Sequence, residues 1–125
     1  MDITGILLFA HGARDPAWAR PFEAVAQQLR TRTAPERVVL AFLEFMGPNL
    51  IDGGQQLVNA GCQQVTVVPL FLGAGGHVRK DLPELLAQLR AQHPGVSWQL
   101  APAVGESPQL VQAMADIAWQ ASQPL

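Results

Sequence analysis

The sequence has a single cysteine, few charged residues and no long apolar run. Because Cys62 has no partner within the chain, an intrachain disulfide and a thiolate-based zinc site are excluded, and a reducing compartment is expected. Residues 1–12 contain no basic stretch, and their apolar run is too short for a signal peptide or a membrane span. These absences predict a cytoplasmic protein with no membrane partner.

Positive charge is also scarce. Eight Lys and Arg residues face ten Asp and Glu residues, and the formal net charge of −2 provides no basic surface for nucleic-acid binding. Any anionic ligand must therefore be held by a local group of cations, for which the candidates are Arg14, Arg79 and Lys80. The remaining basic residues are expected on solvated helix faces or at helix ends: Arg20, Arg30, Arg32, Arg37 and Arg90.

Apolar residues make up 49% of the 125 residues, enough for one compact domain, which we expect to span residues 1–125. Four apolar runs rich in β-branched residues predict strands at residues 3–10, 37–43, 64–72 and 96–102. Segments with helical periodicity alternate with these runs. The alternation predicts a three-layer α/β fold, with a mainly parallel four-stranded sheet and helices on both faces.

Capping residues mark two of the expected helices. Asp15 followed by Pro16 predicts the start of the first helix, and Ser107 followed by Pro108 predicts the start of the last. The apolar stripe expected along the first helix consists of Trp18, Phe22, Val25 and Leu29.

The two middle helices are less clearly bounded. The second is expected to start near Pro48, and Gly53 and Gly54 in its middle should lower its stability. Pro69 predicts an irregularity in the third strand, since proline removes a donor from the ladder. The third helix is predicted from the stripe Leu82, Leu85, Leu86 and Leu89.

Polar side chains follow three of the predicted strands. His11 ends the first apolar run, Glu44 follows the second, and His77 lies in a glycine-rich segment after the third. Because ligands of an open parallel sheet bind beyond the carboxyl ends of its strands, these residues are expected at one site. Two imidazoles and a carboxylate suit Co²⁺, Fe²⁺, Ni²⁺ or Zn²⁺ and leave coordination positions open for exchange.

These residues also have ordinary structural interpretations. A loop histidine such as His11 can simply end a strand, and Glu44 could form an ion pair with Arg14 or Lys80. Residues 73–76, GAGG, could cradle a phosphate, although they match neither nucleotide-binding glycine pattern. We expect them instead to form a flexible loop that lets His77 reach a ligand.

Two further residues are expected to have structural roles. His93 is assigned to a helix terminus. Cys62 precedes the third strand, at the opposite end from the three candidate ligands, and is assigned to packing.

Three motifs considered together are specific: LLFAHGARDP (7–16), AFLEFMGPNL (41–50) and VVPLFLGAGGHVRKDLP (67–83). In this order and spacing they resemble the small, half-length CbiX-type sirohydrochlorin chelatases of the class II chelatase family. The resemblance covers nearly the whole chain and implies one lobe of a class II chelatase fold. It also implies a homodimer that inserts a divalent metal ion, Co²⁺ or else Fe²⁺ or Ni²⁺, into sirohydrochlorin without ATP or an organic cofactor.

The resemblance assigns roles to the candidate ligands. His11 and His77 correspond to the family's catalytic and metal-binding histidines, and Glu44 to the glutamate that assists metal binding. Family members commonly have a serine where this chain has Ala13, so a hydroxyl contact at that position is absent. The implied pathway is cobalamin or sirohaem biosynthesis.

Sirohydrochlorin carries many carboxylates, which require cations at the mouth of the cleft. Arg14, Arg79 and Lys80 flank the two histidines and are the expected substrate-binding cations. Gly75 and Gly76 are expected to allow close approach of the substrate.

Two other functions fit parts of the pattern. A non-catalytic metal or tetrapyrrole carrier would use the same three ligands and differ in failing to turn over. A histidine-dependent phosphoryl transferase also places a histidine and a glycine after its first strand, but that family has an arginine where this chain has Ala10.

Overall fold

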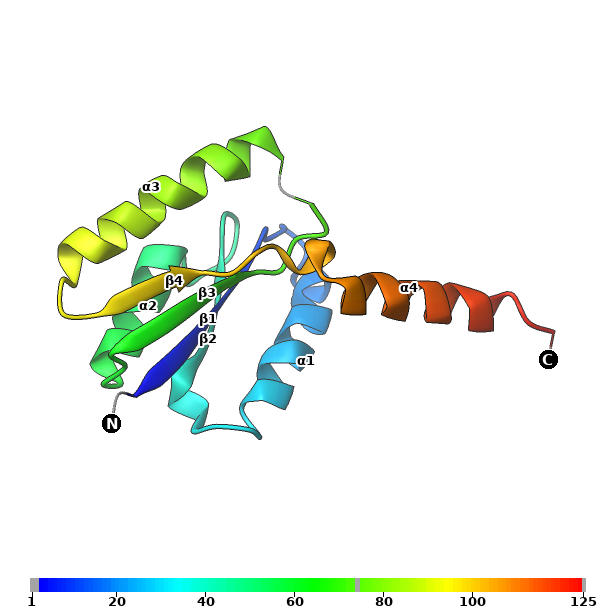
Figure 1. Cartoon of the computed structure of the whole chain (residues 1–125), viewed down its shortest axis with the longest axis horizontal. Helices are drawn as coiled ribbons and strands as arrows, with labels where there is room; N and C mark the ends of the chain where they lie inside the picture. Colours follow the sequence, from blue (N-terminus) through cyan, green and yellow to red (C-terminus); the bar gives the residue numbers. More distant parts are fainter. Residues whose placement is uncertain (1–2, 74, 125) are drawn as a thin grey trace.

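The computed structural model describes residues 3–73 and 75–124, apart from the side chain of His77. Four strands, β1 (Thr4–Ala10), β2 (Val38–Phe42), β3 (Gln64–Pro69) and β4 (Ser97–Leu100), form one parallel sheet (Figure 1). The strand order is β2-β1-β3-β4, so β2 and β4 are the edges. The predicted parallel four-stranded sheet is confirmed.

Helices cover both faces of this sheet. A 3-10 turn (Pro16–Ala19) leads into α1 (Arg20–Leu29) on one face, while α2 (Leu50–Asn59) and α3 (Gly76–Gln92) cover the other (Figure 1). The chain steps from β1 to β2 in one direction and from β2 to β3 and β4 in the other. Right-handed crossovers therefore place α1 opposite α2 and α3. The last helix, α4 (Pro108–Ala121), extends away from the body.

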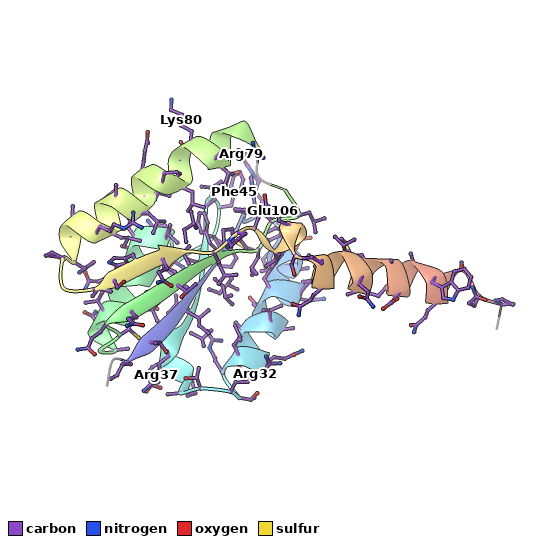
Figure 2. All side chains as sticks on the ribbon, viewed as in Figure 1. Arg32, Arg37, Phe45, Arg79, Lys80 and Glu106 are labelled. Carbon is purple, nitrogen blue, oxygen red and sulfur yellow. The ribbon has the colours of Figure 1, made fainter. Side chains whose placement is uncertain are left out.

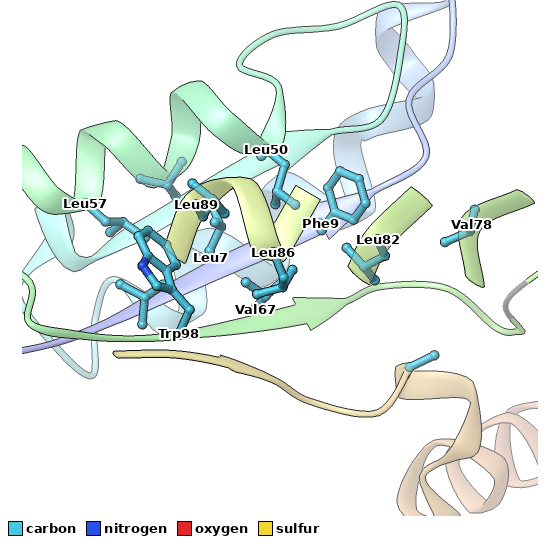
Figure 3. Close-up of a cluster of buried hydrophobic side chains, with 14 of the residues drawn as sticks. Leu7, Phe9, Leu50, Leu57, Val67, Val78, Leu82, Leu86, Leu89 and Trp98 are labelled. Atoms are coloured by element: carbon cyan, nitrogen blue, oxygen red, sulfur yellow. The ribbon is translucent and has the colours of Figure 1, made fainter. Parts of the chain in front are cut away.

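The larger hydrophobic core lies between the sheet and the helices α2 and α3 (Figure 3). Alternate residues of each strand point into it, as expected for a sheet buried on both faces. A smaller core lies under α1. The fully buried side chains with the largest volumes are Phe9, Leu7, Leu8, Leu50, Leu57, Leu86, Leu89, Val65 and Val67.

The two glycines in α2 have a packing role. A Cβ at Gly53 would lie 3.0 Å from Leu7 of β1, and a Cβ at Gly54 would lie 2.6 Å from Leu89 of α3. Glycine lowers helix propensity, as the sequence predicted, but at these positions it lets α2 approach the sheet and α3 closely. The cost in propensity is therefore offset by a tighter core.

Several strand ends differ from the prediction. β3 ends at Pro69 and not at residue 72, although Leu70 N–H still donates to the carbonyl of Phe9 in β1 at 2.8 Å. β4 ends at Leu100 and not at residue 102. Val25 is 41% exposed, and Ala26 takes its place in the core beneath α1. Within the described ranges, no helix combines the length and apolar character needed to cross a membrane.

Two arginines expected to be merely solvated support the sheet edges. Arg30 donates to the carbonyl of Val38 on β2 at 3.1 Å, and Arg90 donates to the carbonyl of Trp98 on β4 at 3.0 Å. Unpaired edge carbonyls can template association with another strand. These two guanidinium groups therefore occupy part of each exposed edge.

Cys62 is 2% exposed and packs against Gly5, which confirms its assignment to packing. Burial raises the pKa of its thiol above the ordinary value. We expect the native protein at pH 8 to react with a thiol reagent at least about 100-fold more slowly than the urea-unfolded chain, since little thiolate is accessible. Equal rates before and after unfolding would contradict the burial of this thiol.

The same pKa shift has a consequence for stability. Folding favours the neutral thiol, so this contribution is present below the pKa of the unfolded thiol and is lost as the pH rises above it. Urea unfolding followed by tryptophan fluorescence should therefore show a lower free energy of unfolding at pH 10 than at pH 8. A Cys62→Ala variant should show a smaller decrease over the same interval.

Candidate functional site

The segments that follow β1, β2 and β3 lie at the same end of the sheet (Figure 1). His11 comes directly after β1, Glu44 lies two residues beyond the end of β2, and His77 is in the first turn of α3. His11 and Glu44 therefore lie at the edge expected for them, and a site that also includes His77 stays a prediction. What the structure describes of their side chains concerns His11 and Glu44.

The side chains of His11 and Glu44 meet. Nε2 of His11 lies 3.2 Å from Oε1 of Glu44, and the two side chains are 51% and 48% exposed. Two donors that each lie about 2.1 Å from one ion are separated by about 3.0–3.4 Å in octahedral or tetrahedral geometry. The pair forms a hydrogen bond, and the same 3.2 Å separation also suits two ligands of one metal ion, with room left for further ligands.

Backbone contacts hold these two residues in place. The parallel pairing of β1 with β2 continues past the strand ends, with Leu43 N–H donating to Ala10 at 2.9 Å and Glu44 N–H donating to His11 at 3.1 Å. Gly12 has φ +91°, and a Cβ there would overlap the carbonyl oxygen of Glu44. Glycine is thus required both by the backbone conformation and by the close approach of the two loops.

The loop from residue 43 to residue 48 projects beside the pair. Its ends are joined by a 2.8 Å hydrogen bond from Phe42 N–H to Pro48, and Phe45 at its tip has φ +65°. A left-handed conformation is unusual for a bulky residue and costs about 1–3 kcal/mol. It holds the ring of Phe45 58% exposed instead of buried in the core.

Arg14 contacts this exposed ring. The guanidinium carbon of Arg14 lies 5.0 Å from the ring centre of Phe45, a cation–π arrangement. Within the described ranges no ion pair joins Glu44 to Arg14 or Lys80, so the alternative pairing considered from the sequence is not formed. Arg14 thus remains available to an anionic ligand at the site.

Asp15 fixes the start of the helix that follows. Its Oδ1 accepts a hydrogen bond from Ala17 N–H at 2.9 Å, so the predicted N-cap is confirmed, although the first turn is 3-10. This cap anchors the segment that carries His11 and Arg14 to the first turn after it.

The glycine-rich segment was expected to be a flexible loop around His77, and this expectation was wrong in part. α3 begins at Gly76, with Gly75 as its N-cap residue and Arg79 N–H donating to the carbonyl of Gly75 at 3.0 Å. His77 is therefore a helical residue at the N-terminus of α3, and the side chain expected to complete the ligand set lies outside the described residues.

Arg79 and Lys80 point in different directions (Figure 2). Arg79 lines a groove between α3 and the segment after β4, together with Leu82 and Glu106. Lys80 projects from α3 away from the sheet. Arg32 and Arg37 lie at the opposite end of the molecule, which supports their exclusion from the site.

The metal ligand set is incomplete within the described part of the chain. Residues 3–73 and 75–124, without the His77 side chain, contain no group of three His, Cys, Asp or Glu side chains that could hold a metal ion. The pair formed by His11 and Glu44 is half-exposed and has the donor types that borderline metals prefer. A half-exposed pair of this kind suits a metal ion that is bound and then released.

Sequence reasoning missed the apolar side chains around the pair. The ring of Phe71 lies 6.3 Å from the ring of His11 in an edge arrangement, and Phe45, next to Glu44, is 58% exposed. The position of Phe45 directly after Glu44 is the sequence signal that could have placed its ring near the site. The positive φ that exposes the Phe45 ring could not be deduced from residue type.

Fold and site together define an open parallel α/β domain with a half-exposed histidine–glutamate pair at the carboxyl edge of its sheet. The chain belongs to the CbiX family, whose model matches residues 5–121. A curated relative from Methanococcus maripaludis, named sirohydrochlorin cobaltochelatase, is 30% identical over 65% of this chain. The matched region spans 56% of that relative's length.

Solved structures agree with this family assignment. A cobalamin (vitamin B12) biosynthesis CbiX protein from Marinobacter aquaeolei VT8 is 37% identical with a TM-score of 0.82, over 94% of this chain and 95% of the other. The sirohydrochlorin chelatase SirB from Bacillus subtilis subspecies spizizenii, in complex with cobalt, is 26% identical with a TM-score of 0.78. This chain covers 51% of SirB and is itself covered over 93% of its length.

Proposed function

We propose that the protein is a sirohydrochlorin chelatase, a lyase that inserts a divalent metal ion into the macrocycle without ATP or an organic cofactor. The observation that carries the proposal is the 3.2 Å separation of His11 Nε2 and Glu44 Oε1 at a half-exposed strand edge. Membership of the CbiX family, with the activity named for the M. maripaludis relative and the cobalt-bound SirB, supports the substrate.

The metal is a substrate of this reaction. His11, Glu44 and His77 are the proposed ligands of hydrated Co²⁺, with Fe²⁺ or Ni²⁺ as the alternatives. The macrocycle docks over the ion, its pyrrole nitrogens replace the protein ligands, and two N–H protons leave as the divalent ion enters. A neutral imidazole of His11 or His77 accepts one of these protons once a pyrrole nitrogen has replaced it on the ion, and water accepts the other.

Substrate carboxylates are assigned to local cations. Arg14 beside Phe45 and Arg79 at the start of α3 are proposed to bind them, with Lys80 at the outer rim. Gly75 and Gly76 are both exposed and a Cβ at either would meet no neighbour within 4 Å, which supports close approach of the substrate there.

The proposal extends to assembly and location. Residues 1–125 form a single chelatase-like domain equivalent in length to half of SirB, and a homodimer would supply the second half of the cleft. We place the protein in the cytoplasm, in cobalamin or sirohaem biosynthesis.

Turnover distinguishes this enzyme from a metal or tetrapyrrole carrier. With protein at one hundredth of the concentration of sirohydrochlorin and Co²⁺ under anaerobic conditions, we expect metallated product to exceed the protein concentration many times. Product that stops at one equivalent of protein would identify a carrier and reject the catalytic proposal.

Phe45 is expected to contribute to macrocycle binding. Replacing Phe45 by alanine removes an exposed aromatic contact worth about 1 kcal/mol and should raise KM for sirohydrochlorin about fivefold. The affinity for Co²⁺ should change little, because the ring is not a ligand. Phe45→Leu should give an intermediate KM, whereas an unchanged KM in both variants would show that the ring does not contact the substrate.

A further inference from the structure

An apolar groove lies between α3 and the segment that follows β4, and we call it the α3 groove. Its volume of about 270 Å³ is below the range of pockets that hold a whole small-molecule ligand, so it suits one part of a larger ligand. The side chains that form its walls include Phe71, Leu82, Leu100, Ala101 and Pro102. An uncharged group therefore gains from burial there, whereas an acidic group would lose its hydration against apolar walls.

The α3 groove adjoins the histidine–glutamate pair through Phe71. The ring of Phe71 lines the groove, and its centre lies 6.3 Å from the centre of the His11 ring. Phe71 is 8% exposed and packs edge-on against Phe9 at 5.8 Å, so the core fixes its position. A ligand centred over His11 can therefore extend one edge past Phe71 into the groove.

Backbone contacts hold the wall of the groove that faces α3. Ala101 N–H donates to the carbonyl of Val67 at 2.9 Å, which continues the pairing of β3 with β4 beyond the end of β4. Gly105, in the 3-10 turn before α4, donates its N–H to the carbonyl of Phe71 at 2.9 Å. The groove is therefore formed before a ligand binds, which lowers the entropic cost of binding.

Two charged side chains line the groove, Arg79 from α3 and Glu106 from the segment after β4. Both are exposed, and Figure 2 shows them at the end of the molecule that carries Phe45. Within the described ranges no ion pair joins Arg79 to Glu106, so the guanidinium can bind a carboxylate of a ligand. Glu106 repels a carboxylate that enters the groove itself. The groove thus favours an uncharged group inside it and a carboxylate at Arg79.

We propose that the α3 groove seats a methyl-bearing edge of sirohydrochlorin, with the methyl group inside the groove and the carboxylate of the neighbouring acid arm on Arg79. The inference rests on the proposed function, because it names the part of that substrate that the site recognises. Sirohydrochlorin carries methyl groups on tetrahedral ring carbons, so these groups project out of the plane of the macrocycle. A projecting methyl group is uncharged and enters the groove while the macrocycle lies over His11.

This seat distinguishes sirohydrochlorin from uroporphyrin, which has the same kinds of acid arms but lacks these methyl groups. One methyl group in an apolar pocket changes affinity by roughly tenfold or more. In anaerobic equilibrium dialysis without metal, we therefore expect the wild type to bind sirohydrochlorin at least about tenfold more tightly than uroporphyrin. Equal affinities for the two macrocycles, or no binding of either, would overturn the inference.

Variants of the groove wall test where this preference arises. Ala101→Leu fills the groove, so the affinity for sirohydrochlorin should fall about tenfold while the affinity for uroporphyrin changes little. Leu100→Ser makes the wall polar at a residue that is 43% exposed, and should lower the same preference even if Ala101→Leu folds poorly. The matched control is Ala87→Leu, at an exposed position of α3 outside the groove. A wild-type preference in both groove variants would contradict the proposed seat.

Arg79→Gln separates the role of the guanidinium from that of the groove. Both macrocycles carry acid arms, so this variant should weaken the binding of both by about tenfold and leave their ratio unchanged. Arg32→Gln, at the opposite end of the molecule, is its control. Unchanged affinities in Arg79→Gln would remove this residue from the seat.

These affinities are measured without metal, so they are independent of turnover. A preference that depends on the groove, in a protein without turnover, would reject the proposed activity and leave this inference standing. Turnover together with a preference that ignores the groove would have the opposite meaning.

Discussion

Replacing His11 by alanine is expected to lower the rate of metal insertion by at least about 100-fold, the range attributed to a single positioned proton acceptor. The change also removes one of the two donors that lie 3.2 Å apart, so the affinity for Co²⁺ should fall in the absence of the macrocycle. Both quantities can be followed by visible absorption under anaerobic conditions.

The fold should survive this substitution, because the His11 side chain is half-exposed and its backbone contacts remain. His93→Ala is the matched control, since it removes an imidazole at the C-terminal end of α3 and should keep wild-type turnover per folded protein. Full activity of His11→Ala would show that the pair is structural.

Gly12→Ala is expected to destabilise the protein and to disturb the site together. The new methyl group would overlap the Glu44 carbonyl at a backbone φ of +91°, for a cost of about 1–3 kcal/mol. Thermal unfolding should show a Tm lower by about 4 °C for each kcal/mol.

The remaining folded Gly12→Ala protein should insert metal more slowly, because relief of the overlap separates the two loops that carry His11 and Glu44. Gly95→Ala is the control: it also adds a methyl group to a glycine, but one where a Cβ meets nothing within 4 Å. A wild-type Tm for Gly12→Ala would contradict the close packing of the two loops.

The order of elements was predictable from the sequence because its signals are local. β-branched runs, the Asp15 cap and helical apolar stripes each report on a few neighbouring residues, and the structure confirms the four strands and four helices that they predict. The C-terminal end of β3 was less predictable. Pro69 has no N–H to donate, and the effect of this missing donor on strand pairing depends on the neighbouring strand.

Features that depend on contacts between distant segments could not be predicted from the sequence. Helix propensity alone makes Gly53 and Gly54 a cost to α2, and their packing role depends on the side chains of Leu7 and Leu89 opposite them. The outward direction of α4 likewise depends on a hydrogen bond between Gly105 and Phe71, which are far apart in the sequence.

The candidate site was likewise predictable in part, from local signals, while its long-range contacts were not. His11 and Glu44 could be proposed because residues after parallel strands share one edge of the sheet, and the structure brings their side chains into contact. From the sequence, the partner of Glu44 can be either a metal or one of the cations Arg14 and Lys80. Its pairing with His11 results from the continued register of β1 and β2 beyond their ends.

The most direct test of the account is the initial rate of the visible spectral change when sirohydrochlorin and Co²⁺ are mixed anaerobically with and without catalytic amounts of the protein. The account predicts a clear acceleration over the uncatalysed reaction that disappears in His11→Ala. No acceleration by folded wild-type protein with Co²⁺, Fe²⁺ or Ni²⁺ would contradict it.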